Sequence, residues 1–195
     1  MVALATRPRR HSYTPEDLLC MPDAGRYELV EGSLKERNMG QESSALALNV
    51  NAELRLHVRR HDLGVIAQAD AGFDIFPAPS TVRFADGSFT RWDRLPGGVP
   101  FSGHSKVAPD LVLEVVSPND GAEEVDAKAA LWLGVGVRLV WVVHPRQRYV
   151  QIWRADGSMA VRREGEVLEG EDVLPGFAMP VSEIFLSYPG APASA

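Results

Sequence analysis

A single acid interrupts one of the most apolar runs of the chain. Glu114 lies within the sequence LVLEVV, residues 111–116. A buried carboxylate is costly there unless it is paired, protonated or bound to a metal ion. The alternative is a carboxylate that reaches solvent at the end of the strand. Because strand-end acids in strand–helix–strand units are common site positions, Glu114 is a candidate catalytic or metal-binding residue.

Lys128 also stands where an apolar residue is expected. On the wheel of a helix predicted from about Gly121 to Leu133, it falls inside the apolar arc formed by Val125, Ala129, Leu131 and Trp132. A lysine on a sheet-facing arc is unusual, which favours a role in a site. The alternative is an ion pair with Glu124 one turn earlier, worth about 0.3–0.5 kcal/mol.

Two aspartates are candidates to share a site with Glu114. Asp86, on the preceding strand-like run, can lie beside Glu114 at the same end of the sheet, although Asp86-Gly87 alone is typical of a hairpin turn. Asp110 shares a strand face with Glu114, but four residues separate them, about 13 Å along the strand. Because Mg²⁺ ligands lie about 2.1 Å from the ion, Asp110 and Glu114 cannot easily share one ion.

Three glutamates are candidates for an auxiliary acid. Strand alternation places Glu31 on the face that carries the larger apolar groups, and Glu28 on the other face. Glu42 opens the long helix predicted for residues 41–61, where an acid also has a helix-dipole explanation. Of the three, Glu31 is preferred.

The elements that would position these residues form a strand–helix–strand unit. Asp110–Val116 fits a strand buried on both faces, and Asp120 is typical of the N-cap of the following helix. A Gly-Val-Gly sequence ends that helix, and Arg138–Val143 is a second apolar strand. A crossover of this length implies that the two strands are parallel.

Basic and histidine side chains mark the end of the long helix. Arg55, Arg59 and Arg60 form either a solvated face or a set of phosphate contacts. His57 and His61, one turn apart, are more typical of packed histidines than of a zinc site, since no HExxH motif accompanies them. The Gly- and Pro-rich stretch 94–109 could form a mobile flap over a site.

Composition indicates a soluble globular protein. The chain has 195 residues, of which 45% are hydrophobic and 24% charged, and we expect one domain over 1–195 with flexible tails at 1–10 and 189–195. The lone Cys20 excludes an internal disulfide and fits a cytoplasmic location. No signal peptide or membrane span is expected. The net charge of −6 argues against a chain coated by nucleic acid, while leaving room for a local basic face.

Several sequence words together resemble the Uma2 (DUF820) family of restriction-endonuclease-like proteins. They are YELVEG (27–32), PDLVLEVVSP (109–118), Lys128, GVRLVWVV (136–143) and LPGF (174–177). The resemblance implies a PD-(D/E)XK nuclease fold, in which helices flank a mixed β-sheet, here with N-terminal and C-terminal β-hairpin additions. It also implies a magnesium-dependent phosphodiesterase site.

The resemblance assigns roles to particular residues. Asp86 matches the family's upstream Pro-Asp, with Ala85 where proline is usual, and Val116 occupies the place of the motif's lysine. The family shows a lysine at the place of Lys128. We therefore expect Asp86, Glu114 and Lys128 to be catalytic with Glu31 as auxiliary acid, and the first two to hold Mg²⁺ or Mn²⁺.

The expected partner is nucleic acid, with DNA preferred as substrate. Arg55, Arg59 and Arg60 would contact its phosphates. A homodimer is expected by analogy of fold alone. Two other functions remain open: an inactive nuclease-like protein that binds nucleic acid or regulates, and a hydrolase of small phosphoesters.

Overall fold

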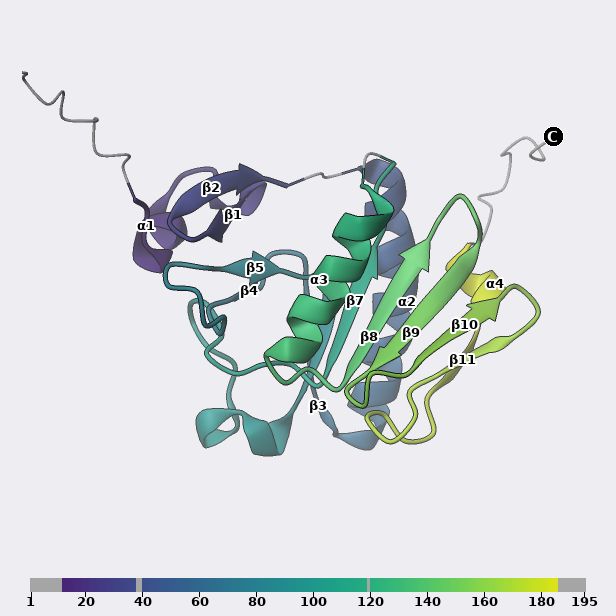
Figure 1. Cartoon of the computed structure of the whole chain (residues 1–195). Helices are drawn as coiled ribbons and strands as arrows, with labels where there is room; N and C mark the ends of the chain where they lie inside the picture. The colour runs from purple at the N-terminus through teal and green to yellow at the C-terminus, as the bar shows by residue number, and fades with distance from the viewer. Residues whose placement is uncertain (1–11, 38–39, 119, 186–195) are drawn as a thin grey trace, which may run out of the picture.

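The computed structural model describes residues 12–37, 40–118 and 120–185 (Figure 1). The tails expected at 1–10 and 189–195 lie outside these ranges. A six-stranded mixed sheet occupies the centre, with the strand order β10-β9-β8-β7-β6-β3. No helix among the described residues has the length and apolar character needed to cross a membrane.

The predicted strand–helix–strand unit forms the middle of this sheet. β7 (Leu111–Val115) and β8 (Leu139–His144) pair in parallel, as expected, and α3 (Ala122–Gly134) connects them. The predicted N-cap is wrong. Gly121 occupies that position, while Asp120 instead accepts a hydrogen bond from the Ser117 backbone N–H at 2.7 Å.

Helices cover both faces of β7, which explains its nearly continuous apolar sequence. α2 (Gln41–His61) lies on one face and α3 on the other (Figure 1). Val50 and Leu54 of α2 belong to the same core cluster as Leu111, Leu113 and Val115. Ala129 and Trp132 of α3 pack with Val112, Val140 and Val142. Glu114 therefore points toward α3, because side chains alternate along a strand.

Antiparallel strands extend the sheet on both sides of this unit. β6 (Gly87–Arg91) pairs with β7 and with β3 (Gly64–Gln68) on one side. On the other side, β9 (Tyr149–Arg154) pairs with β8 and with β10 (Met159–Arg163). A small pair, β11 (Val167–Glu169) and β12 (Ala178–Pro180), leads into α4 (Val181–Ile184).

The N-terminal residues and the segment 72–84 build a separate layer beside α3 (Figure 1). It contains α1 (Pro15–Cys20), η1 (Ala24–Arg26), the antiparallel pair β1 (Tyr27–Val30) and β2 (Ser33–Glu36), and the short pair β4 (Gly72–Phe73) and β5 (Arg83–Phe84). Its core cluster consists of Leu18, Leu29, Val82 and Phe84. The 3-10 turns η2 (Trp92–Arg94) and η3 (Pro96–Gly98) follow β6.

Candidate active site

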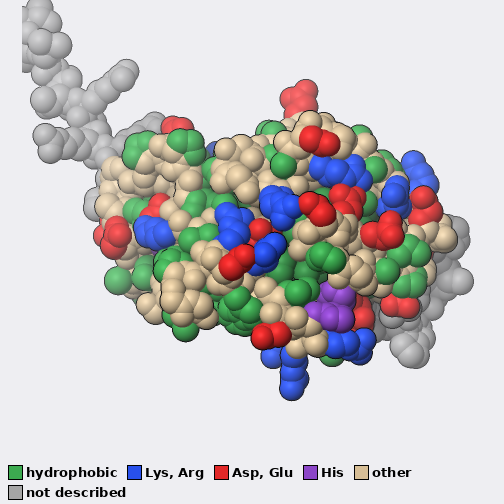
Figure 2. All heavy atoms as spheres, turned by 90° about the horizontal axis from the view of Figure 1, so that it is seen from below, with side chains coloured by type: hydrophobic (Ala, Val, Ile, Leu, Met, Phe, Trp, Pro, Cys, Tyr) green, Lys and Arg blue, Asp and Glu red, His purple; other side chains and the backbone are tan. Residues whose placement is uncertain are grey.

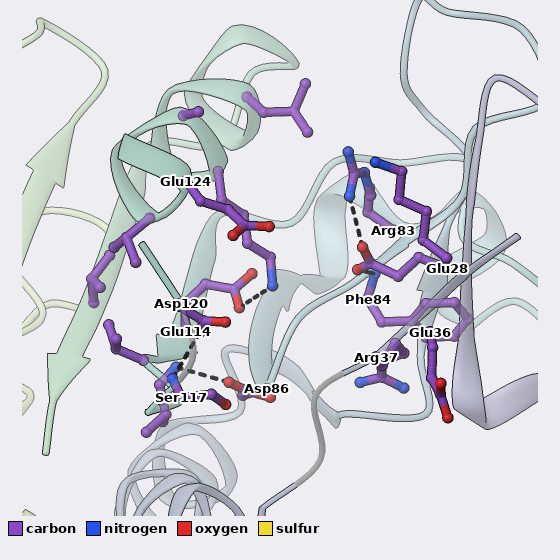
Figure 3. Close-up of a pocket in the computed structure, with 18 residues that line it drawn as sticks. Glu28, Glu36, Arg37, Arg83, Phe84, Asp86, Glu114, Ser117, Asp120 and Glu124 are labelled. Carbon is purple, nitrogen blue, oxygen red and sulfur yellow. Dashed lines mark hydrogen bonds and ion pairs between the residues drawn. The ribbon is translucent and has the colours of Figure 1, made fainter. Parts of the chain in front are cut away.

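A pocket of about 400 Å³ opens where β7 ends, between α3 and the β1–β2 hairpin (Figure 3). Its walls carry an excess of acids over bases. The acids are Glu28, Glu36, Asp86, Glu114, Asp120 and Glu124, and the bases are Lys35, Arg37, Arg83 and Lys128.

Glu114 is the most deeply buried of these acids, with a side chain only 8% exposed. Its Oε2 accepts a hydrogen bond from Lys128 Nζ at 2.7 Å, and its Oε1 accepts one from Trp132 Nε1 at 2.7 Å. Burial raises the pKa of Glu114 to about 7, with Lys128 opposing the rise and Asp86 adding to it. Glu114 is therefore a carboxyl that titrates near neutrality.

Lys128 contacts Glu114 rather than the Glu124 of the alternative interpretation. Burial lowers the pKa of its ammonium, but the nearby carboxylates of Glu114 and Glu28 outweigh burial and raise that pKa overall. The ammonium therefore stays charged, with the carboxylates of Glu114 and Glu28 on opposite walls of the pocket.

The register of β6 against β7 places Asp86 next to Glu114. β6 and β7 pair Gly87 with Leu113, so Asp86, one step beyond, lies across from Glu114. Asp86 Oδ2 accepts a hydrogen bond from the Val115 backbone N–H at 2.8 Å. Burial raises the pKa of Asp86, while Lys128 lowers it. Asp86 and Gly87 thus form the entry to β6 rather than a hairpin turn.

A close approach between α2 and β6 holds this entry in place. Asn51 Nδ2 donates a hydrogen bond to the Asp86 carbonyl at 3.0 Å. A Cβ atom on Gly87 would lie 2.2 Å from Asn51 Oδ1, so a glycine is needed for the approach.

The structure does not bring Glu31 to the pocket. β1 ends at Val30, and Glu31 occupies the exposed turn after it with φ of 48°. Strand alternation therefore does not extend to Glu31, and the expected placement is wrong. Glu28 lines the pocket instead: its Oε2 pairs with Arg83 Nη1 at 2.7 Å and its Oε1 accepts the Phe84 backbone N–H at 3.2 Å.

Other predicted residues also lie outside the pocket lining. Glu42 is exposed in the first turn of α2. Asp110 is used within the fold: Arg94 Nη1 lies 3.1 Å from its Oδ1, and the Arg91 backbone N–H donates to its Oδ2 at 3.0 Å. No residue of the stretch 94–109 lines the pocket, so it is not a flap over this site.

The three arginines of α2 do not line the pocket either. Arg55, Arg59 and Arg60 are exposed near the end of the helix where β3 begins. Figure 2 shows the molecule from this end, and acidic and basic side chains are interspersed there rather than gathered into one basic surface. His57 packs against His61 and Phe177, with its Nε2 3.2 Å from the Pro175 carbonyl, as expected of packed histidines.

The donor set of the pocket fits magnesium better than zinc. The described residues contain no group of three or more His, Cys, Asp or Glu side chains arranged to hold a metal ion. Mg²⁺ commonly takes one or two carboxylates and completes its shell with water and phosphate oxygens. Asp86 and Glu114 supply two carboxylates whose charged forms are destabilised by burial, which an added cation would relieve.

Three residues of the site were missed from the sequence. Trp132 reads as part of an apolar arc, although its place one turn after Lys128 puts it on the same face. Asn51 gives a weak signal as a polar residue within the apolar stripe of α2. Arg37 gives no signal, because its approach to Asp86 depends on how the hairpin packs.

Comparison with known proteins is consistent with this architecture. A solved protein from Anabaena variabilis, described as "a putative nuclease belonging to DUF820", superposes with a TM-score of 0.73 at 18% identity, covering 89% of this chain and 97% of that one. No curated protein matches. The model of the Uma2 family, described as "Putative restriction endonuclease", matches residues 15–182. The chain therefore belongs to the Uma2 family.

Proposed function

We propose that the protein is a metal-dependent endonuclease that hydrolyses phosphodiester bonds of DNA, with a PD-(D/E)XK arrangement of site residues. One observation carries the proposal. Asp86 and Glu114 meet at one end of the sheet, and Lys128 reaches Glu114 from α3 inside a pocket. Membership of the Uma2 family supports it.

The lysine of the motif is supplied from a helix rather than from the strand. Val116 stands two residues after Glu114 and lines the pocket, but it cannot carry a charge. Lys128 Nζ, 2.7 Å from Glu114 Oε2, provides the ammonium at that place. This substitution keeps the charge next to the acid while moving its origin from β7 to α3.

Each residue has a defined task in this proposal. Asp86 and Glu114 would hold Mg²⁺ or Mn²⁺, which supplies Lewis-acid polarisation of phosphate and an activated water. The Val115 N–H and Trp132 N–H fix the orientation of the two carboxylates. Lys128 stabilises the negative charge that develops on the phosphate oxygens. Glu28 faces Lys128 from the opposite wall and replaces Glu31 as the proposed auxiliary acid.

A cleavage screen tests the function. Purified protein is incubated with DNA, RNA and nucleotides in the presence of Mg²⁺, Mn²⁺ or EDTA. We expect endonucleolytic products from DNA with either metal and none with EDTA or with Glu114→Gln. Cleavage that persists in EDTA would contradict the metal-dependent mechanism.

Two observations favour the other candidates. Both oxygens of Glu114 already have protein donors, as expected of an inactive site that binds nucleic acid without cutting it. The pocket of about 400 Å³ is also within the size range of small-molecule sites, which suits a small phosphoester. The same screen separates these two candidates. A hydrolase of small phosphoesters would cleave nucleotides but not DNA, and an inactive nucleic-acid-binding protein would cleave neither.

We also propose that the protein is cytoplasmic and forms a homodimer. Cys20 is an exposed free thiol, which suits a reducing cytoplasm. A homodimer would let two such sites act on the two strands of a duplex.

A further inference from the structure

An arginine faces the candidate site from the N-terminal hairpin. Arg37 directly follows β2 and lines the pocket. Figure 3 shows its guanidinium on the side of the hairpin that faces Asp86. Arg83 and Lys128 are paired with Glu28 and Glu114, whereas no ion pair to Arg37 is found within the described part of the chain. Its charge is therefore available to an anion from outside.

Contacts on the hairpin hold Arg37 in position. Its backbone N–H donates to the Arg26 carbonyl at 2.8 Å, and its Nη1 donates to the Gly25 carbonyl at 3.0 Å. Its Cζ lies 4.7 Å from the centre of the buried Phe84 ring, a cation–π distance. A guanidinium held in this way loses little conformational freedom when it binds a ligand.

Lys35 adds a second cation to the same wall. It lies two residues before Arg37, and both residues line the pocket. It pairs in register with Glu28 of β1, lines the pocket and is exposed. Like Arg37, it forms no ion pair with any described residue. Arg37 also lowers the pKa of Asp86 against the larger effect of burial, which supports its proximity to that carboxylate.

We propose that Arg37 and Lys35 form an anion subsite that binds the phosphate next to the cleaved bond. The inference rests on the proposed nuclease function and deepens it, because the subsite would lay the nucleic-acid strand across Asp86, Glu114 and Lys128. The guanidinium of Arg37 can bind two phosphate oxygens at once, and Lys35 acts as a point charge. Arg37 is thus a positioning residue that does not touch the bond being broken.

The test is a scan of neutral phosphates. A short DNA duplex carries one methylphosphonate at each position in turn, and fluorescence anisotropy measures binding with Ca²⁺ in place of Mg²⁺. Wild-type protein should lose roughly tenfold in affinity where the phosphate contacted by Arg37 is neutralised. Arg37→Met should bind unmodified DNA roughly tenfold more weakly and should be insensitive to neutralisation at that one position.

Arg91→Met is the matched control. Arg91 ends β6, five residues after Asp86 or about 16 Å along the strand, and its exposed guanidinium pairs with Asp93. This variant removes the same charge and should keep the wild-type pattern of sensitivity.

Two results would overturn the subsite while leaving the nuclease function intact. One is an Arg37→Met variant with the same sensitivity as wild type at every phosphate. The other is unchanged affinity together with a shifted acid limb of the cleavage pH profile, which would mean that Arg37 acts only through Asp86. Wild-type protein that neither binds nor cuts DNA would instead refute the proposed function, and the subsite with it.

Discussion

The carboxyl group of Glu114 is subject to opposing influences. Burial and the neighbouring Asp86 favour its neutral form, while Lys128 and the Trp132 N–H favour its charged form, and the resulting pKa is about 7. A group in this balance gives up its proton readily when a cation arrives. The pH dependence of the site should therefore differ from that of an ordinary glutamate.

Metal affinity should rise with pH across neutrality. Glu114 must lose its proton to coordinate a metal ion, so binding of Mg²⁺ or Mn²⁺ should strengthen by up to about tenfold per pH unit below its pKa and level off above about pH 8. Titration calorimetry at a series of pH values measures this. Affinity that is constant from about pH 5.5 to 8 would show that Glu114 is not a ligand with a raised pKa.

Lys128→Met should change how stability depends on pH. A carboxyl whose pKa is raised on folding stabilises the folded state at low pH, and this contribution is lost as pH rises through the folded pKa. Without Lys128 the pKa of Glu114 rises further, so stability should fall by up to about 1.4 kcal/mol per pH unit above neutrality. Urea unfolding at about pH 5, 7 and 9 measures it.

The double variant Glu114→Gln/Lys128→Met provides the control. It removes both charges while keeping similar side-chain volumes, and its stability should vary with pH no more than that of wild type. A single Lys128→Met variant with an equally flat profile would mean that the ion pair contributes nothing to the state of Glu114.

Residue type and spacing were sufficient to select Glu114 and Lys128 as candidates, because a charge inside an apolar pattern is a visible exception, and the structure brings the two side chains together. Trp132 could not be recognised in this way, since an indole within an apolar arc is typical of core packing. Strand alternation also misplaced Glu31, because it does not show at which residue a strand gives way to its turn.

At the scale of elements, α3 is attached to β7 by a polar contact within an apolar interface. Trp132 is fully buried among apolar neighbours, yet its indole N–H donates a hydrogen bond to Glu114 Oε1 at 2.7 Å. Trp141 of β8 is equally buried, but its indole nitrogen has no hydrogen-bond partner among the described residues. The two tryptophans therefore allow the polar contact to be separated from packing.

Trp132→Phe should cost more stability than Trp141→Phe. Both substitutions remove similar volume, but only the first removes a hydrogen bond to a charged group, worth about 1.5–3 kcal/mol. Urea unfolding at about pH 8, where Glu114 is ionised, should show a difference of this size. Equal losses would indicate that the Trp132 N–H does not hold the carboxylate.

The parallel pairing of β7 and β8 followed from local patterns. The Val- and Leu-rich run before the crossover helix predicted a parallel β7–β8 pair, and the structure confirms it. The start of β6 at Gly87 could not be predicted from local patterns, because Asp86-Gly87 has the composition of a turn. Its role as a strand entry depends on Asn51, which approaches from a distant part of the chain.

At the scale of the whole molecule, the charge distribution opposes the approach of DNA. The chain carries a net charge of −6, and the pocket is lined by six acidic and four basic side chains. The end of the molecule shown in Figure 2 carries no continuous basic surface. A polyanion can enter this site only if cations compensate its charge.

DNA binding should therefore require a divalent cation. We expect a short duplex to bind in Ca²⁺ and to bind at least roughly tenfold more weakly in EDTA at the same ionic strength, as measured by anisotropy. Arg55→Met should have little effect, because Arg55 lies outside the pocket. Equal affinity in Ca²⁺ and EDTA would place binding elsewhere on the surface.

The most direct test of the account is the rate of Mg²⁺-dependent DNA cleavage by wild type, Lys128→Met and the Glu114→Gln/Lys128→Met double variant. Thermal melts of the same preparations, at a pH where all three are folded, exclude loss of structure as the cause. We expect cleavage by wild type and a loss of about 100-fold or more in both variants, since both lack the charge that acts on the phosphate. Wild-type protein without activity, or Lys128→Met that cuts at the wild-type rate, would contradict it.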